Sequence, residues 1–318
     1  MAGRRVLCLG VFLVQRRTLC KTKLVKIMAR LITFSVDGIK RPGAIKDGRA
    51  LDLAAAGLPT GETGDLLEII RGGDPVLARV RSAVADWTAQ DFPLDTVKLE
   101  APILHPPKVI GVGLNYIDHC REANMAVPAE PVIFTKYSTS VTGPYDDVYW
   151  YKDVCQNIDY EIELGVVMGK QASRVSEEEA LDYVLGYTVV NDVSARDLQL
   201  GGAGQWDIGK SLNTFCPYGP AIVTSSEVEN PHDLDLSLTV NGEMRQTSNT
   251  SNLIFKIPTL IAYLSKGITL LPGDLIATGT PFGVAMGMKD PIWLKDGDVC
   301  EGKIDGLGTI RNTIRAMG

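Results

Sequence analysis

Histidine and cysteine are scarce in this 318-residue sequence, which contains three histidines and six cysteines. No CxxC pair occurs, and no cysteine–histidine grouping has the spacing of a zinc site. The cysteines are too widely separated for the framework of a small disulfide-stabilised domain, so we expect a reducing compartment. A Walker sequence, a GxSxG elbow and a complete dinucleotide fingerprint are also absent, which argues against the chemistry that those motifs support.

Long hydrophobic runs are absent as well, and the first 30 positions contain no acidic residue. The apolar run at residues 6–14 is too short to span a bilayer, so no membrane insertion is expected. The same 30 positions hold eight basic residues, a composition that suits a mitochondrial presequence over residues 1–27. Alternatively, translation starts at Met28 and the protein is cytoplasmic, because the sequence from Met28 onward reads as a natural beginning.

The rest of the chain is acidic. It carries the remaining 24 basic residues and all 38 acidic residues, a net charge of −14. Such a surface repels phosphate backbones, so we expect no nucleic-acid partner.

Short apolar runs bounded by glycine and proline predict a mostly β protein of the α+β class. Residues 28–103 read as strands followed by an amphipathic helix, and we assign them to a small N-terminal α/β domain. Three prolines within residues 101–108 mark a domain boundary, so residues 104–318 form the second domain. In that domain, Asn241-Gly242 predicts a hairpin turn between two alternating runs.

Helical patterns are few. Apolar residues recur at helical spacing over 75–88, and the remaining helix-like segments lie at 115–125, 176–185 and 253–266. The expected fold is therefore dominated by strands, with the interesting side chains at strand ends.

The strongest local signal is DYEIELGVVMG at residues 159–169. Glu161 and Glu163 are two positions apart in an apolar run, so on a strand their side chains point to the same face. Two carboxylates on one face repel each other unless a cation or a proton lies between them. Such a pair is often a solvated strand edge, but its apolar neighbours here favour a metal site.

A third acidic candidate, Asp192, ends the next apolar run, in LGYTVVNDVSARD at residues 185–197. Together with Glu161 and Glu163 it would offer only carboxylate oxygens, which suit a hard cation. Mg²⁺ is favoured, and Mn²⁺ or Ca²⁺ are alternatives. Asp197 is the alternative third ligand; otherwise it is a salt-bridge or turn residue.

His119 and Glu122 are three positions apart in a helix-like segment and share a face. A carboxylate beside an imidazole orients the ring and raises its basicity, the arrangement expected of a general base. The alternative is an ordinary surface pair. The other two histidines are weaker candidates, because His105 lies among prolines and His232 lies in a turn-like stretch.

Two further segments carry polar groups of interest. Lys210 follows a glycine in DIGKSLNTFCP, where it either binds a substrate carboxylate or lies in a solvated loop. The segment ATGTPFGV at residues 277–284 predicts a turn whose backbone N–H groups and hydroxyls suit an anionic oxygen, although such turns also occur without a ligand.

Five segments, taken in this order, resemble the fumarylacetoacetate hydrolase superfamily over about residues 104–318. They are GVGLNYIDHCREAN, IDYEIELGVVMGK, GYTVVNDVSARDLQ, GKSLNTFCPYGPAIV and GDLIATGTPFGV. Within the superfamily the sequence is most similar to the eukaryotic group of fumarylacetoacetate hydrolase domain-containing proteins of type 2. That group shares the N-terminal domain and a QTSNTSNLIFK-like segment.

The resemblance implies a mixed β-sandwich or roll fold for the catalytic domain, a homodimer, and a divalent metal held by Glu161, Glu163 and Asp192. It also implies that His119 and Glu122 form a dyad on a lid that orders over the substrate. Four further residues are expected to line the pocket by the same resemblance: Lys210, Arg196, Gln199 and Thr280.

Members of the superfamily act on small 2-oxo acids, and the type 2 group is associated with keto–enol tautomerisation of oxaloacetate. One departure is informative: acylpyruvate-cleaving members have Arg in a VGRNY sequence where this chain has Leu114. We therefore expect a Mg²⁺-dependent oxaloacetate tautomerase. The first alternative is a C–C bond hydrolase or decarboxylase acting on acylpyruvates or oxaloacetate, and a distant one is a non-catalytic protein that binds 2-oxo acids.

Overall fold

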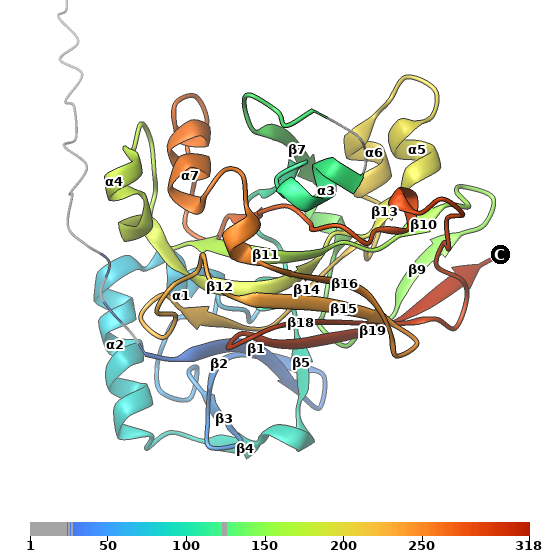
Figure 1. Cartoon of the computed structure of the whole chain (residues 1–318). Helices are drawn as coiled ribbons and strands as arrows, with labels where there is room; N and C mark the ends of the chain where they lie inside the picture. The colour runs from blue at the N-terminus through green and yellow to red at the C-terminus, as the bar shows by residue number, and fades with distance from the viewer. Residues whose placement is uncertain (1–23, 25, 27, 123–125) are drawn as a thin grey trace, which may run out of the picture.

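A computed structural model describes residues 24, 26, 28–122 and 126–318 of the chain. Strands dominate the described residues, so the predicted mostly β, α+β fold is confirmed. Figure 1 shows the short helices α3 to α7 gathered on one side of the sheets, and the N-terminal strands and helices on the opposite side.

The larger of the two main sheets contains twelve strands. Ten of them follow one another in the order β4 (Asp91–Pro93), β3 (Arg49–Asp52), β2 (Ile39–Lys46), β1 (Arg30–Val36), β14 (Cys216–Thr224), β12 (Val184–Asn191), β11 (Ile162–Met168), β17 (Leu275–Ala277), β6 (Val109–Gly113) and β7 (Val132–Lys136). The other two pair at its sides: β5 (Lys98–Glu100) with β1, and β8 (Val141–Thr142) with β14.

The second main sheet has five strands and lies against the first. Its order is β16 (Glu243–Asn249), β15 (Asp235–Val240), β18 (Val299–Ile304), β19 (Gly308–Met317) and β9 (Val148–Tyr151). A small two-stranded sheet joins β10 (Ile158–Asp159) to β13 (Ser194–Ala195). Most of the buried apolar side chains between these sheets and the helices above them form one continuous core.

The α-helices are short. They are α1 (Leu67–Arg71), α2 (Gly73–Asp86), α3 (Ile117–Glu122), α4 (Glu177–Ala180), α5 (Arg196–Leu200), α6 (Trp206–Lys210) and α7 (Ile257–Ser265). In the part of the chain that the structure describes, five 3₁₀ turns accompany them: η1 (Leu94–Thr96), η2 (Ser138–Ser140), η3 (Leu181–Tyr183), η4 (Thr250–Asn252) and η5 (Ala285–Gly287). Four of the helices, α2, α3, α4 and α7, overlap the predicted segments, whereas α1, α5 and α6 were not predicted. No helix among the described residues is both long and apolar enough to cross a membrane.

Tight turns with positive φ angles set the register of several hairpins, and two of them illustrate the pattern. Asn241 and Gly242 have φ angles of 54° and 81° and connect β15 to β16, as the sequence predicts. Asp37 and Gly38, with φ angles of 51° and 76°, connect β1 to β2 in the same way. Positive φ at both central residues defines a turn whose twist matches that of antiparallel strands, and asparagine, aspartate and glycine tolerate it best.

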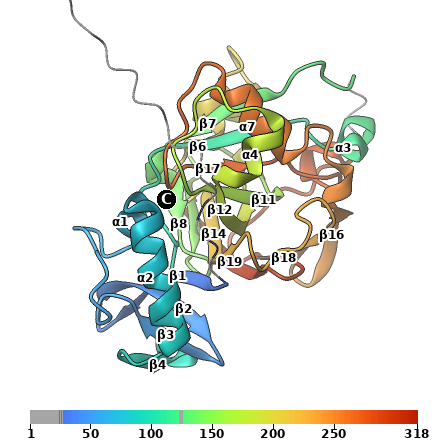
Figure 2. The same ribbon diagram turned by 90° about the vertical axis from the view of Figure 1, so that its left-hand side faces the viewer.

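The N-terminal strands are continuous with the larger sheet. Arg30 and Leu31 in β1 pair with Val223 and Ile222 in β14. A second apolar core joins side chains of α1, α2 and β1–β3 to side chains of β11, β12, β14 and β17. Figure 2 shows α2 alongside these N-terminal strands. The residues predicted as an N-terminal domain therefore pack on, and hydrogen-bond to, the sheet that carries the site described next.

Candidate functional site

The pairing of β11 with β12 brings three predicted ligands together. Ile162 lies opposite Asn191, and the backbone N–H of Asp192 donates to the carbonyl oxygen of Glu161 over 2.8 Å. Carboxylate oxygens of Glu161, Glu163 and Asp192 all lie within 4.8 Å of one another, and all three residues are buried. Every residue of β11 and β12 is buried, which agrees with the apolar character of their sequences.

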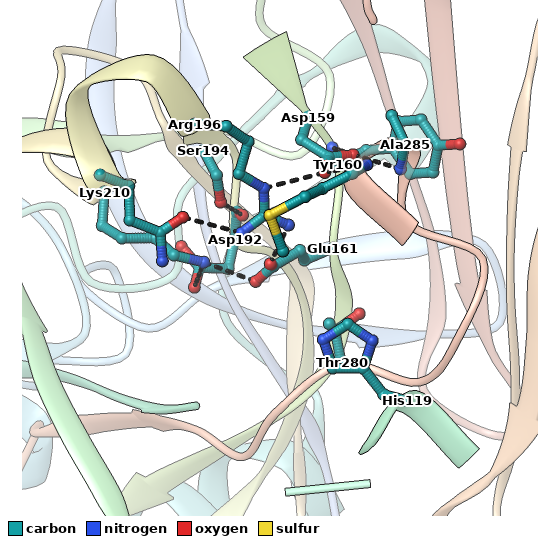
Figure 3. Close-up of polar contacts among 12 residues, drawn as sticks. His119, Asp159, Tyr160, Glu161, Asp192, Ser194, Arg196, Lys210, Thr280 and Ala285 are labelled. Atoms are coloured by element: carbon teal, nitrogen blue, oxygen red, sulfur yellow. Dashed lines mark hydrogen bonds and ion pairs between the residues drawn. The ribbon is translucent and has the colours of Figure 1, made fainter. Parts of the chain in front are cut away.

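Three buried cationic side chains partner this carboxylate cluster. Lys210 Nζ lies 2.6 Å from Glu161 Oε2 and 2.8 Å from Asp192 Oδ2. Arg196 donates to Glu161 Oε1 over 2.5 Å, and Lys136 donates to Asp192 Oδ1, also over 2.5 Å. Figure 3 shows the side chains of Lys210 and Arg196 converging on Glu161. Buried charges of this kind persist only when they are paired, as they are here.

These contacts shift the pKa values of Glu161 and Glu163 in opposite directions. Burial alone would raise the pKa of Glu161, but the charges of Lys210 and Arg196 outweigh it and hold that pKa at about 2. For Glu163, burial and the neighbouring charges of Asp192 and Glu161 raise the pKa well above its usual value. The carboxylate of Glu161 is therefore firmly ionised, whereas ionisation of Glu163 is unfavourable without a further cation.

The donor set fits a hard divalent cation. Each oxygen of Glu161 and Asp192 accepts one hydrogen bond from a cationic side chain. A carboxylate oxygen has two lone pairs, so each of these oxygens retains one for a metal. Glu163 accepts a hydrogen bond from Gly279 N at Oε2, and a cation near its carboxylate would remove the repulsion that raises its pKa.

Asp192, and not its alternative Asp197, belongs to the cluster. Asp197 lies on α5, where its Oδ2 accepts a hydrogen bond from the backbone N–H of Gln156 over 2.7 Å. Its role in the structure is to tie a loop to the start of that helix.

The two residues of the predicted dyad are in contact. His119 and Glu122 lie on α3, with 3.4 Å between His119 Nδ1 and Glu122 Oε2. His119 is buried, and the side chain of Glu122 is 20% exposed. A carboxylate at Nδ1 favours the tautomer that carries a proton there, which leaves Nε2 as the basic nitrogen.

The turn predicted to bind an anionic oxygen binds two carboxylates of the protein itself. Gly279 N–H donates to Glu163 Oε2 over 2.8 Å. Gly283 N–H points at the carboxylate of Glu122, with 3.0 Å and 3.1 Å to its two oxygens. One short segment thus contacts both the carboxylate cluster and the dyad.

A cavity of about 430 Å³ brings the predicted groups to one surface. Its polar lining consists of His119, Glu122, Glu161, Glu163, Arg196, Gln199, Lys210 and Thr280. Its remaining lining consists of Val112, Gly113, Leu114, Phe134, Leu200, Trp206, Met286 and Gly287. All the predicted site residues except Asp192 therefore line one cavity, and Asp192 accepts a hydrogen bond from Lys210, which does line it.

Three buried polar residues of the site were not predicted. Lys136, at the end of β7, is bonded to Asp192 and to the carbonyl oxygens of Val193 and Lys210. Asp159 accepts a hydrogen bond from Arg196 Nε over 2.9 Å. Gln246, on β16, donates to Thr280 Oγ1 over 2.8 Å. Lys136 was recognisable as a lysine at the end of the apolar run of β7. Asp159 and Gln246 begin two segments quoted above, but nothing within those segments marked either residue as part of the site.

Comparisons with known proteins agree with this geometry. The family model described as "Fumarylacetoacetate (FAA) hydrolase C-terminal" matches residues 108–315. "Oxaloacetate tautomerase Fahd2a, mitochondrial" of Rattus norvegicus is 39% identical over 324 residues, which cover 98% of this chain and 99% of the rat protein. "Oxaloacetate tautomerase YisK" of Bacillus subtilis is 45% identical over 262 residues, which cover 79% of this chain and 86% of the bacterial protein.

A solved structure extends the similarity to the whole fold. The maleylpyruvate hydrolase of Sphingobium sp. SYK-6, in complex with manganese(II) and pyruvate, superposes with a TM-score of 0.75 at 30% identity. The superposition covers 91% of this chain and all of that chain. The family match spans more than half of the sequence, and it includes every residue of the carboxylate cluster and of the dyad. The chain belongs to the fumarylacetoacetate hydrolase family.

Proposed function

We propose that the protein is a divalent-metal-dependent enzyme that interconverts the enol and keto forms of oxaloacetate. The observation that carries this proposal is the shared cavity: a buried three-carboxylate cluster and a histidine–glutamate pair line or adjoin one chamber of about 430 Å³. The names of the rat and bacterial relatives, both oxaloacetate tautomerases, favour the same reaction.

We assign the proposed metal ligands and the positively charged residues of the cavity to different roles. Glu161, Glu163 and Asp192 are the proposed ligands of Mg²⁺, with Mn²⁺ as an alternative supported by the manganese in the related hydrolase structure. A cation bound there would supply Lewis-acid stabilisation of the negative charge that develops on the substrate. Lys210 and Arg196 present further positive charge to the same cavity.

Proton transfer is assigned to the dyad. His119, with its Nδ1 turned to Glu122, has its Nε2 available to take the proton from the enol oxygen and to return a proton to C3. Glu122 stabilises the imidazolium that forms between these steps. Gln199, which accepts a hydrogen bond from Arg196 over 2.8 Å, and Thr280 are proposed to orient the substrate.

The direct test is stopped-flow ultraviolet absorbance of enol-oxaloacetate decay, with and without Mg²⁺. We expect purified protein to accelerate the decay in a Mg²⁺-dependent manner, and His119→Ala to reduce the acceleration. Asp197→Asn serves as the matched control, since Asp197 lies outside the cluster and asparagine can still accept the hydrogen bond from Gln156. Acceleration that is the same with and without Mg²⁺ would argue against the proposal.

Hydrolysis of acylpyruvates is the second candidate, because the same pair could deprotonate a water instead. Leu114 disfavours it, since this residue lines the cavity where acylpyruvate-cleaving members of the superfamily have an arginine, and it offers no cation to the substrate carboxylate. Acetylpyruvate cleavage measured in parallel separates the two reactions. Robust cleavage without any effect on enol decay would establish the hydrolase.

Two further proposals concern context. We infer mitochondrial targeting by residues 1–27 from their basic, acid-free composition and from the word "mitochondrial" in the name of the rat relative. A fluorescent reporter fused to residues 1–30 should enter mitochondria, and a cytosolic reporter would refute the inference. We also propose a homodimer, as the family resemblance implies; light scattering of the purified protein at micromolar concentration tests it.

A further inference from the structure

The carboxylate of Glu122, which contacts His119, is also held by the segment at residues 279–287. Gly283 N–H reaches both of its oxygens, as described above. Gly287 approaches it even more closely: a Cβ atom on Gly287 would lie 2.5 Å from Glu122 Cδ, 2.7 Å from Oε2 and 2.9 Å from Oε1. Residue 287 therefore leaves room for this carboxylate only because it has no side chain.

The segment that holds Glu122 is itself fixed at both ends by buried side chains. Asp159, which is fully buried, accepts hydrogen bonds from Ala285 N over 2.7 Å and from Met286 N over 3.1 Å. Gln246 donates to the carbonyl oxygen of Pro281 over 3.0 Å. Figure 3 shows Asp159 with its dashed contacts to Ala285. The backbone N–H groups of Gly287 and Met288 also donate to the carbonyl oxygens of Val284 and Ala285, each over 3.1 Å. Because the backbone around residue 287 is held in this way, an added side chain there would displace Glu122 rather than the segment.

The required absence of a side chain is not explained by backbone conformation. Gly279 and Gly283 have φ angles of 107° and 95°, which other residues rarely adopt, whereas the φ of Gly287 lies outside that range. Alanine at 287 is therefore compatible with the backbone. The three atoms that a Cβ would meet first all belong to the far end of one flexible side chain, so the protein can relieve the clash by moving Glu122 alone.

We propose that Gly287 is a positioning residue: it sets the distance between Glu122 and His119 and so determines the efficiency of the base. This rests on the proposed function, in which His119 moves the proton. Glu122 stays within 3.4 Å of His119 Nδ1 because Gly283 N–H binds it and Gly287 leaves space for it. A bulkier residue would push the carboxylate away from the ring, and the imidazole would lose the charge that orients it.

The test is Gly287→Ala, with Gly267→Ala as the matched control. Gly267 has no atom within 4 Å of its hypothetical Cβ, and its φ also permits alanine. We expect Gly287→Ala to lower kcat by about 10²-fold, the loss that a displacement of about 1 Å can cause at a reacting group. Thermal stability and Mg²⁺ affinity should remain as in the wild type, because only Glu122 moves. The control should match the wild type in all three measurements.

A double-mutant cycle separates positioning from a general structural effect. Once Glu122→Ala has removed the carboxylate, Gly287→Ala should cause no further loss of kcat, since nothing remains for the added Cβ to displace. Losses that multiply in the double variant would overturn the proposal. A Gly287→Ala enzyme with unchanged kcat would overturn it as well.

One further variant distinguishes failure of this inference from failure of the proposed function. If His119→Ala loses activity while Gly287→Ala keeps it, the dyad is correct and the positioning role of Gly287 is wrong. If His119→Ala keeps full activity while binding Mg²⁺ normally, the dyad does not carry the proton, and both proposals fall together.

Discussion

The variant Glu163→Gln separates two effects of the carboxylate cluster: its effect on the stability of the metal-free protein and its role in binding a metal. Burial, together with the neighbouring charges of Asp192 and Glu161, raises the pKa of Glu163. Glutamine has nearly the same shape, and its carbonyl oxygen can still accept the hydrogen bond from Gly279 N. In metal-free buffer the substitution removes like-charge repulsion, so the melting temperature should equal or exceed that of the wild type.

The same substitution removes one of three proposed metal ligands. A ligand present at 100 times its Kd stabilises a protein by about 2.7 kcal/mol. With an unfolding entropy of about 2.1 cal/mol/K per residue, that energy raises the melting temperature of a chain of this size by about 4 °C. We expect this Mg²⁺-dependent shift in the wild type, and none in Glu163→Gln at the same concentration.

Differential scanning calorimetry in chelator-treated buffer, followed by Mg²⁺ addition, measures both effects. Asp197→Asn, outside the cluster, should show the full shift. The reasoning is refuted if Glu163→Gln lowers the metal-free melting temperature, or if the variant keeps the Mg²⁺-dependent rise. The first result would mean that the ionised carboxylate stabilises the fold, and the second that the cation binds elsewhere.

Three further predictions follow from buried or unusual positions. Lys136→Met should lower the metal-free free energy of unfolding by about 3–5 kcal/mol in urea denaturation, because it removes one member of a fully buried ion pair with Asp192; a loss below about 1 kcal/mol would contradict the pairing. Leu114→Arg should lower the KM for acetylpyruvate by about tenfold in a steady-state assay, through a charge-assisted hydrogen bond to the substrate. The φ of Leu114 is 53°, and leucine and arginine bear the same backbone strain there, so the substitution itself should not disturb the backbone. An unchanged KM would therefore contradict the idea that the missing positive charge disfavours acylpyruvate substrates. Protein that begins at Met28 should retain its activity, and lose only about 1 kcal/mol in denaturation, because Leu24 packs partly buried on the second core; aggregation of the shortened protein would show that the removed residues are structural.

The parts of the fold and site that the sequence predicts depend on local patterns. The Asn241-Gly242 turn needs only two adjacent residues, and the shared face of Glu161 and Glu163 follows from the period of a strand. Asp192 was found because it ends an apolar run. That its carboxylate meets the other two depends on the register of β11 with β12, which periodicity does not give. The resemblance to a known family implied the ligand set without that register.

What the sequence did not predict depends on distant partners. Gln246 accepts a hydrogen bond from Ile162 N, 84 positions away, and Asp159 caps backbone groups more than 120 positions later in the chain. Neither residue differs from an ordinary surface amide or carboxylate until the second sheet and the loop after β17 pack against β11. Gly287 likewise gives no signal in the sequence, since its importance is the space that it leaves for Glu122.

The pairing of β1 with β14 has a consequence for synthesis of the chain. Arg30 finds its partner in Val223, 193 positions later. At about 5–20 residues per second, a ribosome needs on the order of 10–40 s to produce that partner after β1 has been made. During this interval Arg30 and Leu31 have no strand beside them on that edge of β1, because β5 pairs only with Thr33–Ser35. The N-terminal hairpin is thus a nascent segment that must be kept from pairing with other chains, and a molecular chaperone that holds it should increase the yield of folded protein.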